Sequence, residues 1–172
     1  MSKYIIDKNK LIENINIIKE KAGVEVIGVV KGNGYGFGMA NLAEILMQNE
    51  IKTFAVTEVY DIPLLRETVL DNDILVMRST CVEEEAKTIA QYDCIATIGS
   101  LSSAEVMDKV SKELGKKTKC HLKIDTGMGR YGFLPSQVES AIKCYDFENL
   151  DFCGAYTHFS SAFHNVQLTK AQ

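Results

Sequence analysis

Short apolar runs rich in β-branched residues alternate along the chain with longer stretches in which apolar residues recur every three or four positions. The first pattern is typical of buried strands, and the second is typical of helices that pack through one face. The intervals between the runs suit consecutive strand–helix units. Six strands are predicted, over residues 24–30, 53–59, 73–77, 94–99, 120–125 and 152–159.

The helical stretches carry start and stop signals. Residues 8–22 place apolar side chains on one face, with Asp7 as a suitable N-cap and Gly23 as a suitable C-terminal stop. Ser102 and Ser136 are each followed three residues later by glutamate, a capping-box spacing that predicts two more helix starts. Further helices are predicted over residues 39–49, 60–68, 82–91 and 165–171.

Strands that alternate with helices imply an α/β fold, in which helices cover a parallel sheet. Two architectures satisfy this pattern, an open doubly wound sheet and a (β/α)8 TIM-type barrel, and the pattern alone does not separate them. Six units fit into the 172 residues, whereas a complete barrel takes about 250 residues. No linker or low-complexity segment divides the chain.

The composition narrows the class of protein. The net charge of −4 argues against a nucleic-acid partner, and no apolar run is long enough to span a membrane. The first ten residues lack the apolar core of a signal peptide. Five cysteines without a C-x-x-C pair, and three histidines without ligand-like spacing, predict reduced thiols and no metal site. We therefore expect a cytoplasmic protein.

The segment VVKGNGYGFG, residues 29–38, places Lys31 where the first strand ends and a glycine-rich turn begins. It is not a dinucleotide-binding loop, because Phe37 and Met39 stand where G-x-G-x-x-G requires glycine. It is not a Walker A loop either, because the lysine precedes the glycines. A strand-end lysine is usually solvated, but a partly desolvated amine at the rim of a barrel can act as a nucleophile or form an imine.

Three segments together resemble one known family. VVKGNGYGFG resembles the pyridoxal-phosphate lysine motif of the alanine racemases, HLKIDTGMGRYGF (121–133) is similar to their LKVDTGM-x-RLGF segment, and YTHFSSA (156–162) is similar to their THFA strand end. Their order and separation match the N-terminal barrel of the fold-type III racemases. The resemblance implies that residues 1–172 form a TIM-type barrel truncated to about six units.

The resemblance also implies site residues. Lys31 corresponds to the lysine that forms a Schiff base with pyridoxal 5'-phosphate and serves as one of two catalytic bases. Tyr35 corresponds to the tyrosine that contacts the cofactor phosphate. Arg130 corresponds to the arginine near the cofactor's phenolic oxygen and the substrate carboxylate, a role that suits a planar cationic donor. His158 corresponds to a histidine that supports the arginine beneath the pyridine ring.

Two further expectations come from the same resemblance. Lys123 corresponds to a lysine that many members carry as a carbamate, which orients the arginine. Asp125, Thr126 and Gly127 would shape the turn at the end of that strand. The resemblance implies an amino-acid racemase that converts L-alanine to D-alanine for cell-wall peptidoglycan, with serine as an alternative substrate. A cofactor-binding homeostasis protein, a decarboxylase on the same fold, and a chain that neither binds nor catalyses remain alternatives.

The sequence also departs from the family pattern. The family's second base, a tyrosine of a C-terminal β-domain, and its last two barrel units have no counterpart here, so we expect these residues alone to be an inactive fragment. Glycines at 32 and 34 replace the usual alanines, and Phe37 replaces a histidine. The unpaired edges of the first and sixth strands predict self-association, in line with the dimers that the family implies.

Overall fold

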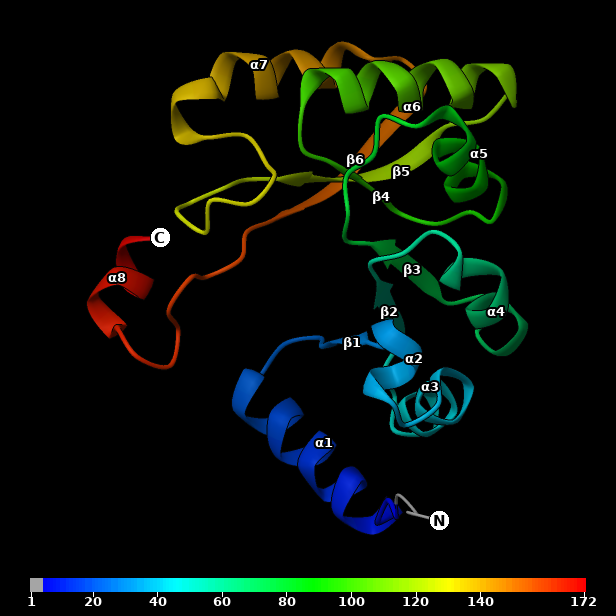
Figure 1. The fold of residues 1–172 in the computed structure, drawn as a ribbon, viewed down its shortest axis with the longest axis vertical. Helices are drawn as coiled ribbons and strands as arrows, with labels where there is room; N and C mark the ends of the chain where they lie inside the picture. Colours follow the sequence, from blue (N-terminus) through cyan, green and yellow to red (C-terminus); the bar gives the residue numbers. More distant parts are fainter. Residues whose placement is uncertain (1–4) are drawn as a thin grey trace. The chain divides into compact units, whose positions relative to one another are not determined.

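A computed structural model describes residues 5–172, which form two compact units, one up to Leu75 and one from Val76 to Gln172. The ribbon, coloured along the chain, is shown in Figure 1. Each unit is described by itself below. None of the described helices combines the length and apolar character needed to cross a membrane.

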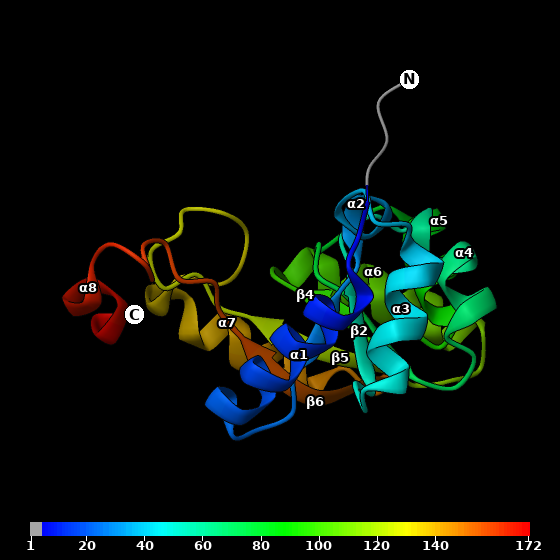
Figure 2. The ribbon, with the colours of Figure 1, turned by 90° about the horizontal axis from the view of Figure 1, so that it is seen from below.

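The first unit contains a parallel sheet with the order β1-β2-β3. Ile27 of β1 lies opposite Thr53 of β2, and both strands run in the same direction. Figure 2 shows α3 and α4 side by side. The elements are α1 (Lys8–Ala22), β1 (Ile27–Val29), α2 (Lys31–Tyr35), α3 (Met39–Gln48), β2 (Thr53–Val56), α4 (Asp61–Thr68) and β3 (Asp73–Val76), whose last residue belongs to the second unit.

Helix α1 has the predicted bounds and both predicted caps. The Asp7 carboxylate accepts hydrogen bonds from the backbone N–H groups of Asn9 and Lys10, at 3.0 and 3.2 Å. Gly23 ends the helix in the left-handed region, with φ +62°, and its N–H bonds to the Lys19 carbonyl. An N-cap of this kind contributes about 1 kcal/mol to helix stability. Local signals alone therefore define this helix.

The second unit contains a parallel sheet with the order β4-β5-β6. Helix α6 packs along all three strands, and α5 packs against α6 (Figure 1). The elements are α5 (Glu83–Gln91), β4 (Ala96–Ile98), α6 (Leu101–Glu113), β5 (Thr118–Lys123), a 3-10 turn (Pro135–Gln137), α7 (Val138–Lys143), a second 3-10 turn (Cys144–Asp146), β6 (Leu150–Tyr156) and α8 (Val166–Ala171).

One backbone hydrogen bond links the first residue of the second unit to the residues before β4. The N–H of Val76, the last residue of β3, donates to the carbonyl of Ile95, just before β4, at 2.9 Å. This bond fixes the start of the second unit to the segment that leads into β4.

All six predicted strands are present, although most are shorter than predicted. Their apolar side chains form the cores of the two units: Phe54, Val56 and Ile74 are buried in the first, and Ile98 and Cys120 in the second. The five cysteines are free, with Cys94, Cys120 and Cys144 buried and Cys81 and Cys153 exposed. Burial raises the pKa of the Cys144 thiol to about 11, so this thiol is unreactive at neutral pH.

Both predicted capping boxes are wrong in position. Helix α6 is capped by Ser100 instead of Ser102: the Ser100 hydroxyl accepts from the Ser103 N–H, and the Ser103 hydroxyl accepts from the Ser100 N–H, both at 3.1 Å. Ser136 lies inside the 3-10 turn, where the Gln137 side chain accepts from the Leu134 N–H instead. Several polar residues lie close together before each of these two helical segments, and the backbone conformation decides which of them serves as the N-cap.

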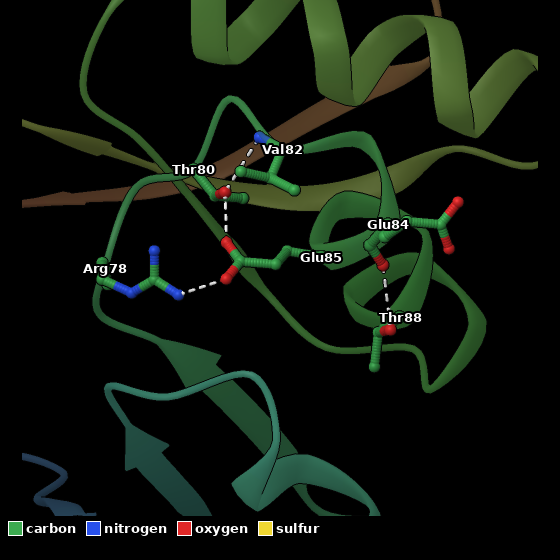
Figure 3. A network of polar contacts seen from close by, with 6 residues as sticks. All are labelled: Arg78, Thr80, Val82, Glu84, Glu85 and Thr88. Carbon is green, nitrogen blue, oxygen red and sulfur yellow. Dashed lines mark hydrogen bonds and ion pairs between the residues drawn. The ribbon is translucent and has the colours of Figure 1, made fainter.

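A polar network fastens the carboxyl end of β3 to α5, as Figure 3 shows. The Arg78 guanidinium donates to the Glu85 carboxylate at 2.7 Å, and the Thr80 hydroxyl donates to its other oxygen. The Thr80 hydroxyl in turn accepts from the Val82 N–H at 3.1 Å. The Arg78 side chain beside Glu85 holds the pKa of that carboxyl below its usual value. The loop between β3 and α5 is therefore anchored at both ends.

Candidate active site

Lys31 begins a left-handed turn that explains the alternating glycines. Gly32, Asn33, Gly34, Tyr35 and Gly36 all have positive φ, between +52° and +89°. A left-handed conformation costs an L-residue roughly 1–2 kcal/mol, and glycine avoids this cost. Asn33 and Tyr35 are the exceptions; asparagine tolerates this region, but Tyr35 is a bulky residue with φ +56°. The turn therefore stores strain at a residue that the sequence predicts to be functional.

The side chains of this turn have different surroundings. The Asn33 amide oxygen accepts from the Met39 N–H at 2.9 Å, which fastens the turn to α3. Gly34 is buried, and an added Cβ there would lie 3.3 Å from Leu42. Lys31 is half-buried and Tyr35 is 61% exposed. Among residues 5–172, none forms a recorded hydrogen bond or ion pair with the Lys31 amine or the Tyr35 hydroxyl.

The second unit holds a turn organised by one carboxylate. Asp125, two residues beyond the end of β5, is 5% exposed. Its carboxylate accepts from the N–H groups of Gly127, Gly129 and Arg130, at 3.0, 3.1 and 2.9 Å. These hydrogen bonds hold the pKa of the Asp125 carboxyl below its usual value, and the bond from Gly127 has the largest effect. The carboxylate thus fixes the backbone that carries Arg130.

Lys123, the last residue of β5, is only 3% exposed. Its amine donates to the Ile124 carbonyl at 2.9 Å and lies 5.5 Å from the centre of the Tyr156 ring. Burial lowers the pKa of the Lys123 amine, and the charge of Arg130 acts in the same direction, while Asp125 opposes both. Lys123 can pack in this position because residue 132 is glycine. A Cβ added at Gly132 would lie 3.0 Å from the Lys123 Cγ and 2.9 Å from the Asp125 nitrogen.

Tyr156 and Thr97 belong to the same cluster, and sequence reasoning missed both. The Tyr156 hydroxyl donates to the Met77 carbonyl at 2.8 Å and lies 2.9 Å from the Thr97 hydroxyl, which donates to the Val76 carbonyl at 2.6 Å. Burial raises the pKa of Tyr156 to about 12. Tyr156 ends β6 and is the first residue of the YTHFSSA segment, two residues before His158, and this position was the signal available in the sequence.

Arg130 and His158 are both exposed, and they lie on segments that contact each other. The Arg130 guanidinium lies 5.6 Å from the centre of the Tyr131 ring. His158 follows Thr157, whose hydroxyl lies 2.7 Å from that of Thr126 in the Asp125 turn. The second unit therefore brings together the segments of Lys123, Arg130 and His158, while Lys31 and Tyr35 share one turn of the first unit.

A cavity of about 500 Å³ in the second unit lies beside these segments without including their predicted site residues. Gly99 and Ser100, at the carboxyl end of β4, form one wall, and Tyr131 and Phe133 form another. The remaining lining residues are Ser79, Cys81, Leu101, Gly132, Gln137 and Ser140.

The comparisons with known proteins agree with the strand order. The family described as "Alanine racemase, N-terminal domain" matches residues 6–172. The alanine racemase of Methanococcus maripaludis is 37% identical over 157 residues, which make up 90% of this chain and 41% of that protein. That of Clostridium tetani is 33% identical over 160 residues, or 91% of this chain and 41% of that protein.

Solved structures show the same fold. An alanine racemase structure from Clostridium difficile 630 superposes with a TM-score of 0.85 at 29% identity, and the match covers 92% of this chain and 43% of that one. A histidine racemase from Leuconostoc mesenteroides subsp. sake gives a TM-score of 0.87 at 23% identity, over 95% of this chain and 45% of that one. The second likeness concerns the fold alone.

Parallel strands that alternate with helices, together with the match to a solved alanine racemase, define an α/β protein of the (β/α)8 type, of which the described residues form six strand–helix units. The fold class predicted from the sequence is confirmed. The chain belongs to the alanine racemase family, through its N-terminal domain. It spans less than half the length of the curated relatives that it matches.

Proposed function

We propose that this chain is the cofactor-attaching part of a pyridoxal-phosphate-dependent amino-acid racemase, an isomerase that acts on alanine. The observation that carries the proposal is the state of Lys31. Its amine stands at the carboxyl end of β1 on a strained left-handed turn, half-buried and without a recorded hydrogen-bond or ion-pair partner among the described residues. A lysine amine that is accessible in this position can condense with an aldehyde.

The residues present fit such a cofactor chemically. Lys31 offers an accessible amine for the aldehyde, and Tyr35 offers an exposed hydroxyl that can donate to a phosphate. Arg130 offers a planar cation for a carboxylate or phenolate oxygen. When bound, pyridoxal phosphate supplies an electron sink that stabilises a carbanion at the substrate Cα.

Each side chain has one role in the proposal. Lys31 binds the cofactor covalently and moves the Cα proton on one face of the substrate. Arg130 orients the substrate carboxylate on a backbone that Asp125 holds in place. His158 supports the arginine that lies beneath the pyridine ring. The base for the second face lies outside these residues, so we expect them to show no racemisation on their own.

Lys123 is the residue that we propose to carry a carbamate. The neutral amine adds to carbon dioxide, a C–N bond forms, and one proton leaves to water. Its surroundings support this reaction: burial favours the neutral amine, and the charge of Arg130 favours the anionic product. Mass spectrometry of the native protein tests it, with an added mass of one carbon dioxide that acid removes. An unmodified amine at all carbon dioxide concentrations would refute this part of the proposal.

The substrate and cellular role follow from the relatives alone. The similar proteins named above are alanine racemases, and one similar fold is a histidine racemase. We propose L-alanine as substrate, D-alanine for peptidoglycan as product, and the cytoplasm as location. Assays of the intact protein on L-alanine, L-serine and L-histidine rank the substrates.

Self-association is a separate part of the proposal. Among the described strands, β1 pairs only with β2 and β6 pairs only with β5. Such parallel edges present unpaired backbone groups that another chain can bind. We propose that the protein forms a homodimer. Sedimentation at micromolar concentration checks this, and a monodisperse monomer contradicts it.

Reductive trapping tests the central assignment. The protein is mixed with pyridoxal phosphate, reduced with borohydride and digested, and we expect the pyridoxyl group on the peptide that contains Lys31. A Lys31→Ala variant loses the label, while Lys123→Met keeps it. Labelling that persists in Lys31→Ala refutes the assignment. Labelling at Lys31 without racemisation by the intact protein favours the alternative, a cofactor-binding homeostasis protein.

A further inference from the structure

Tyr156 lies at the centre of the polar cluster of the second unit, although no role was assigned from the sequence to this first residue of the YTHFSSA segment. It is the register partner of Lys123: β5 and β6 run parallel, and the two residues stand side by side on the same face of the sheet. The distance of 5.5 Å from the Lys123 amine to the ring centre is within the range of a cation–π interaction. The ring therefore forms one wall of the space that holds the amine.

The Tyr156 hydroxyl fixes the ring at its far end. It bonds to the Met77 carbonyl, just beyond β3, and contacts the Thr97 hydroxyl of β4. The end of β3 and the middle of β4 thus both contact one side chain of β6. Since the ring is held at both ends, by the strand backbone and by its hydroxyl, it cannot swing away from Lys123 without breaking these bonds.

Four residues near the Lys123 amine affect its charge: Ile124, Asp125, Arg130 and Tyr156. Asp125 and the Tyr156 ring favour the ammonium form, while Arg130 and burial oppose it. The Ile124 carbonyl accepts one of its protons. Of these neighbours, Tyr156 is the only one contributed by β6, and the others belong to β5 and the turn that follows it.

We propose that Tyr156 is a positioning residue: with its hydroxyl anchored to Met77 and Thr97, its ring holds the Lys123 amine in place beside the Arg130 turn and sets its protonation. The part that concerns catalysis rests on the proposed function, because Arg130 is there the residue that binds the substrate carboxylate. The part that concerns Lys123 is a property of its free amine, before any carbamate forms, and is tested without cofactor in buffer freed of carbon dioxide.

NMR titration of the intact protein, labelled with carbon-13 at lysine Cε, measures the Lys123 amine directly. A Lys123→Met variant assigns the resonance. Removal of the ring in Tyr156→Leu should lower the titration midpoint by about 0.5–1 pH unit, because a cation–π contact stabilises the charged form by about 1 kcal/mol. Tyr156→Phe keeps the ring but not its anchor, and should give a smaller shift in the same direction.

Tyr145→Leu is the matched control, since it removes a tyrosine that stacks on Phe152 in the same unit, with ring centres 4.5 Å apart, and that does not contact Lys123. It should leave the midpoint unchanged. Thr97→Val provides a second variant that removes one anchor and keeps the ring, for the case in which a Tyr156 variant does not fold. Equal midpoints in the wild type and Tyr156→Leu, or a Lys123 that stays charged in every variant, would overturn the proposal.

Two readouts separate this proposal from the proposed function. Borohydride labelling at Lys31 should be the same in all Tyr156 variants, so a failure to label concerns the function alone. If the intact protein racemises alanine, Tyr156→Leu should raise KM more than it lowers kcat, and Tyr156→Phe should recover most of the loss. A merely structural role predicts instead that activity follows the folded fraction, with no change in the Lys123 midpoint.

Discussion

Two lysines occupy equivalent places in the two units and have opposite surroundings. Lys31 follows β1, and Lys123 ends β5, so both stand at the carboxyl end of a parallel strand. Lys31 is half-buried on a left-handed turn, without a recorded bond to the described residues. Lys123 is 3% exposed, bonded to a carbonyl and packed on an aromatic ring.

The difference shows that the position on the strand does not assign a role to a lysine. The role proposed for Lys31 needs an accessible amine, and Lys31 is half-buried with no recorded bond to the described residues. An amine that supports a neighbour needs a fixed position, which the Asp125 turn and Tyr156 provide. What distinguishes the two regions is how tightly the residues after the strand are packed.

The largest expected effect comes from a methyl group added at one glycine in each region. Gly132→Ala forces a Cβ to within 2.9 Å of the Asp125 nitrogen, with φ +122°, and should destabilise the protein by about 3 kcal/mol. Gly32→Ala meets no atom within 4 Å and carries only the strain of φ +59°, about 1 kcal/mol. Urea unfolding measures both.

The outcome that would break the comparison is an equal loss of stability in the two variants. It would mean that the Lys31 turn is packed as closely as the Asp125 turn. Gly36→Ala, which also meets no atom within 4 Å, serves as a second variant of the open kind.

The next effect is a pH dependence of stability, which is expected for the Asp125 turn and not for the Lys31 turn. The folded pKa of Asp125 lies below its ordinary value of 3.8, so its contribution is complete above that pH and is lost as the pH falls through the folded pKa. Asp125→Asn should therefore destabilise the protein at neutral pH, and the difference from the wild type should vanish in acid. Asn33→Ala, which removes the hydrogen bond that fastens the Lys31 turn to α3, should cost the same at every pH.

Urea unfolding at several pH values provides this measurement. A loss in Asp125→Asn that does not depend on pH would show that the hydrogen-bonding shape of the side chain matters and its charge does not. In that case the Asp125 turn and the Lys31 turn would differ in packing but not in their dependence on charge.

A smaller effect is expected at the anchored loop after β3. Glu85→Gln weakens the bonds to Arg78 and Thr80, and should cost about 1 kcal/mol at neutral pH. Because the folded pKa of Glu85 lies below its ordinary value of 4.5, the cost should disappear as the pH falls through it. Glu84→Gln is the control, since its side chain points away from the network (Figure 3). Equal effects of the two substitutions would contradict this reading.

The sequence predicted what depends on neighbours in the chain. The bounds of α1 followed from Asp7 and Gly23, which act within one helical turn of its ends. The six strands followed from apolar runs that only a buried sheet accommodates. Lys31 and Asp125 stood out because their motifs are continuous.

The sequence could not predict the contacts that depend on the register of strand pairing. Tyr156 and Thr97 are 59 residues apart, and their contact exists only because β4, β5 and β6 align as they do. The burial of Lys123 has the same origin, since its partner Tyr156 is set by the pairing of two strands. Ser100 was missed for a different reason: three serines compete within four residues, and only the backbone selects one.

The smallest expected change in stability belongs to the residue with the largest proposed role. Lys31→Met keeps the length of the side chain, and the amine that it removes has no recorded bond to the described residues, so stability should stay within about 0.5 kcal/mol of the wild type. The same variant should lose all pyridoxyl labelling. Urea unfolding without cofactor measures the change in stability, and borohydride reduction with pyridoxal phosphate measures the labelling. A large destabilisation would show that Lys31 is held by the fold as Lys123 is. Its amine would then be a structural group, because a lysine that binds a cofactor covalently must be free to leave its neighbours.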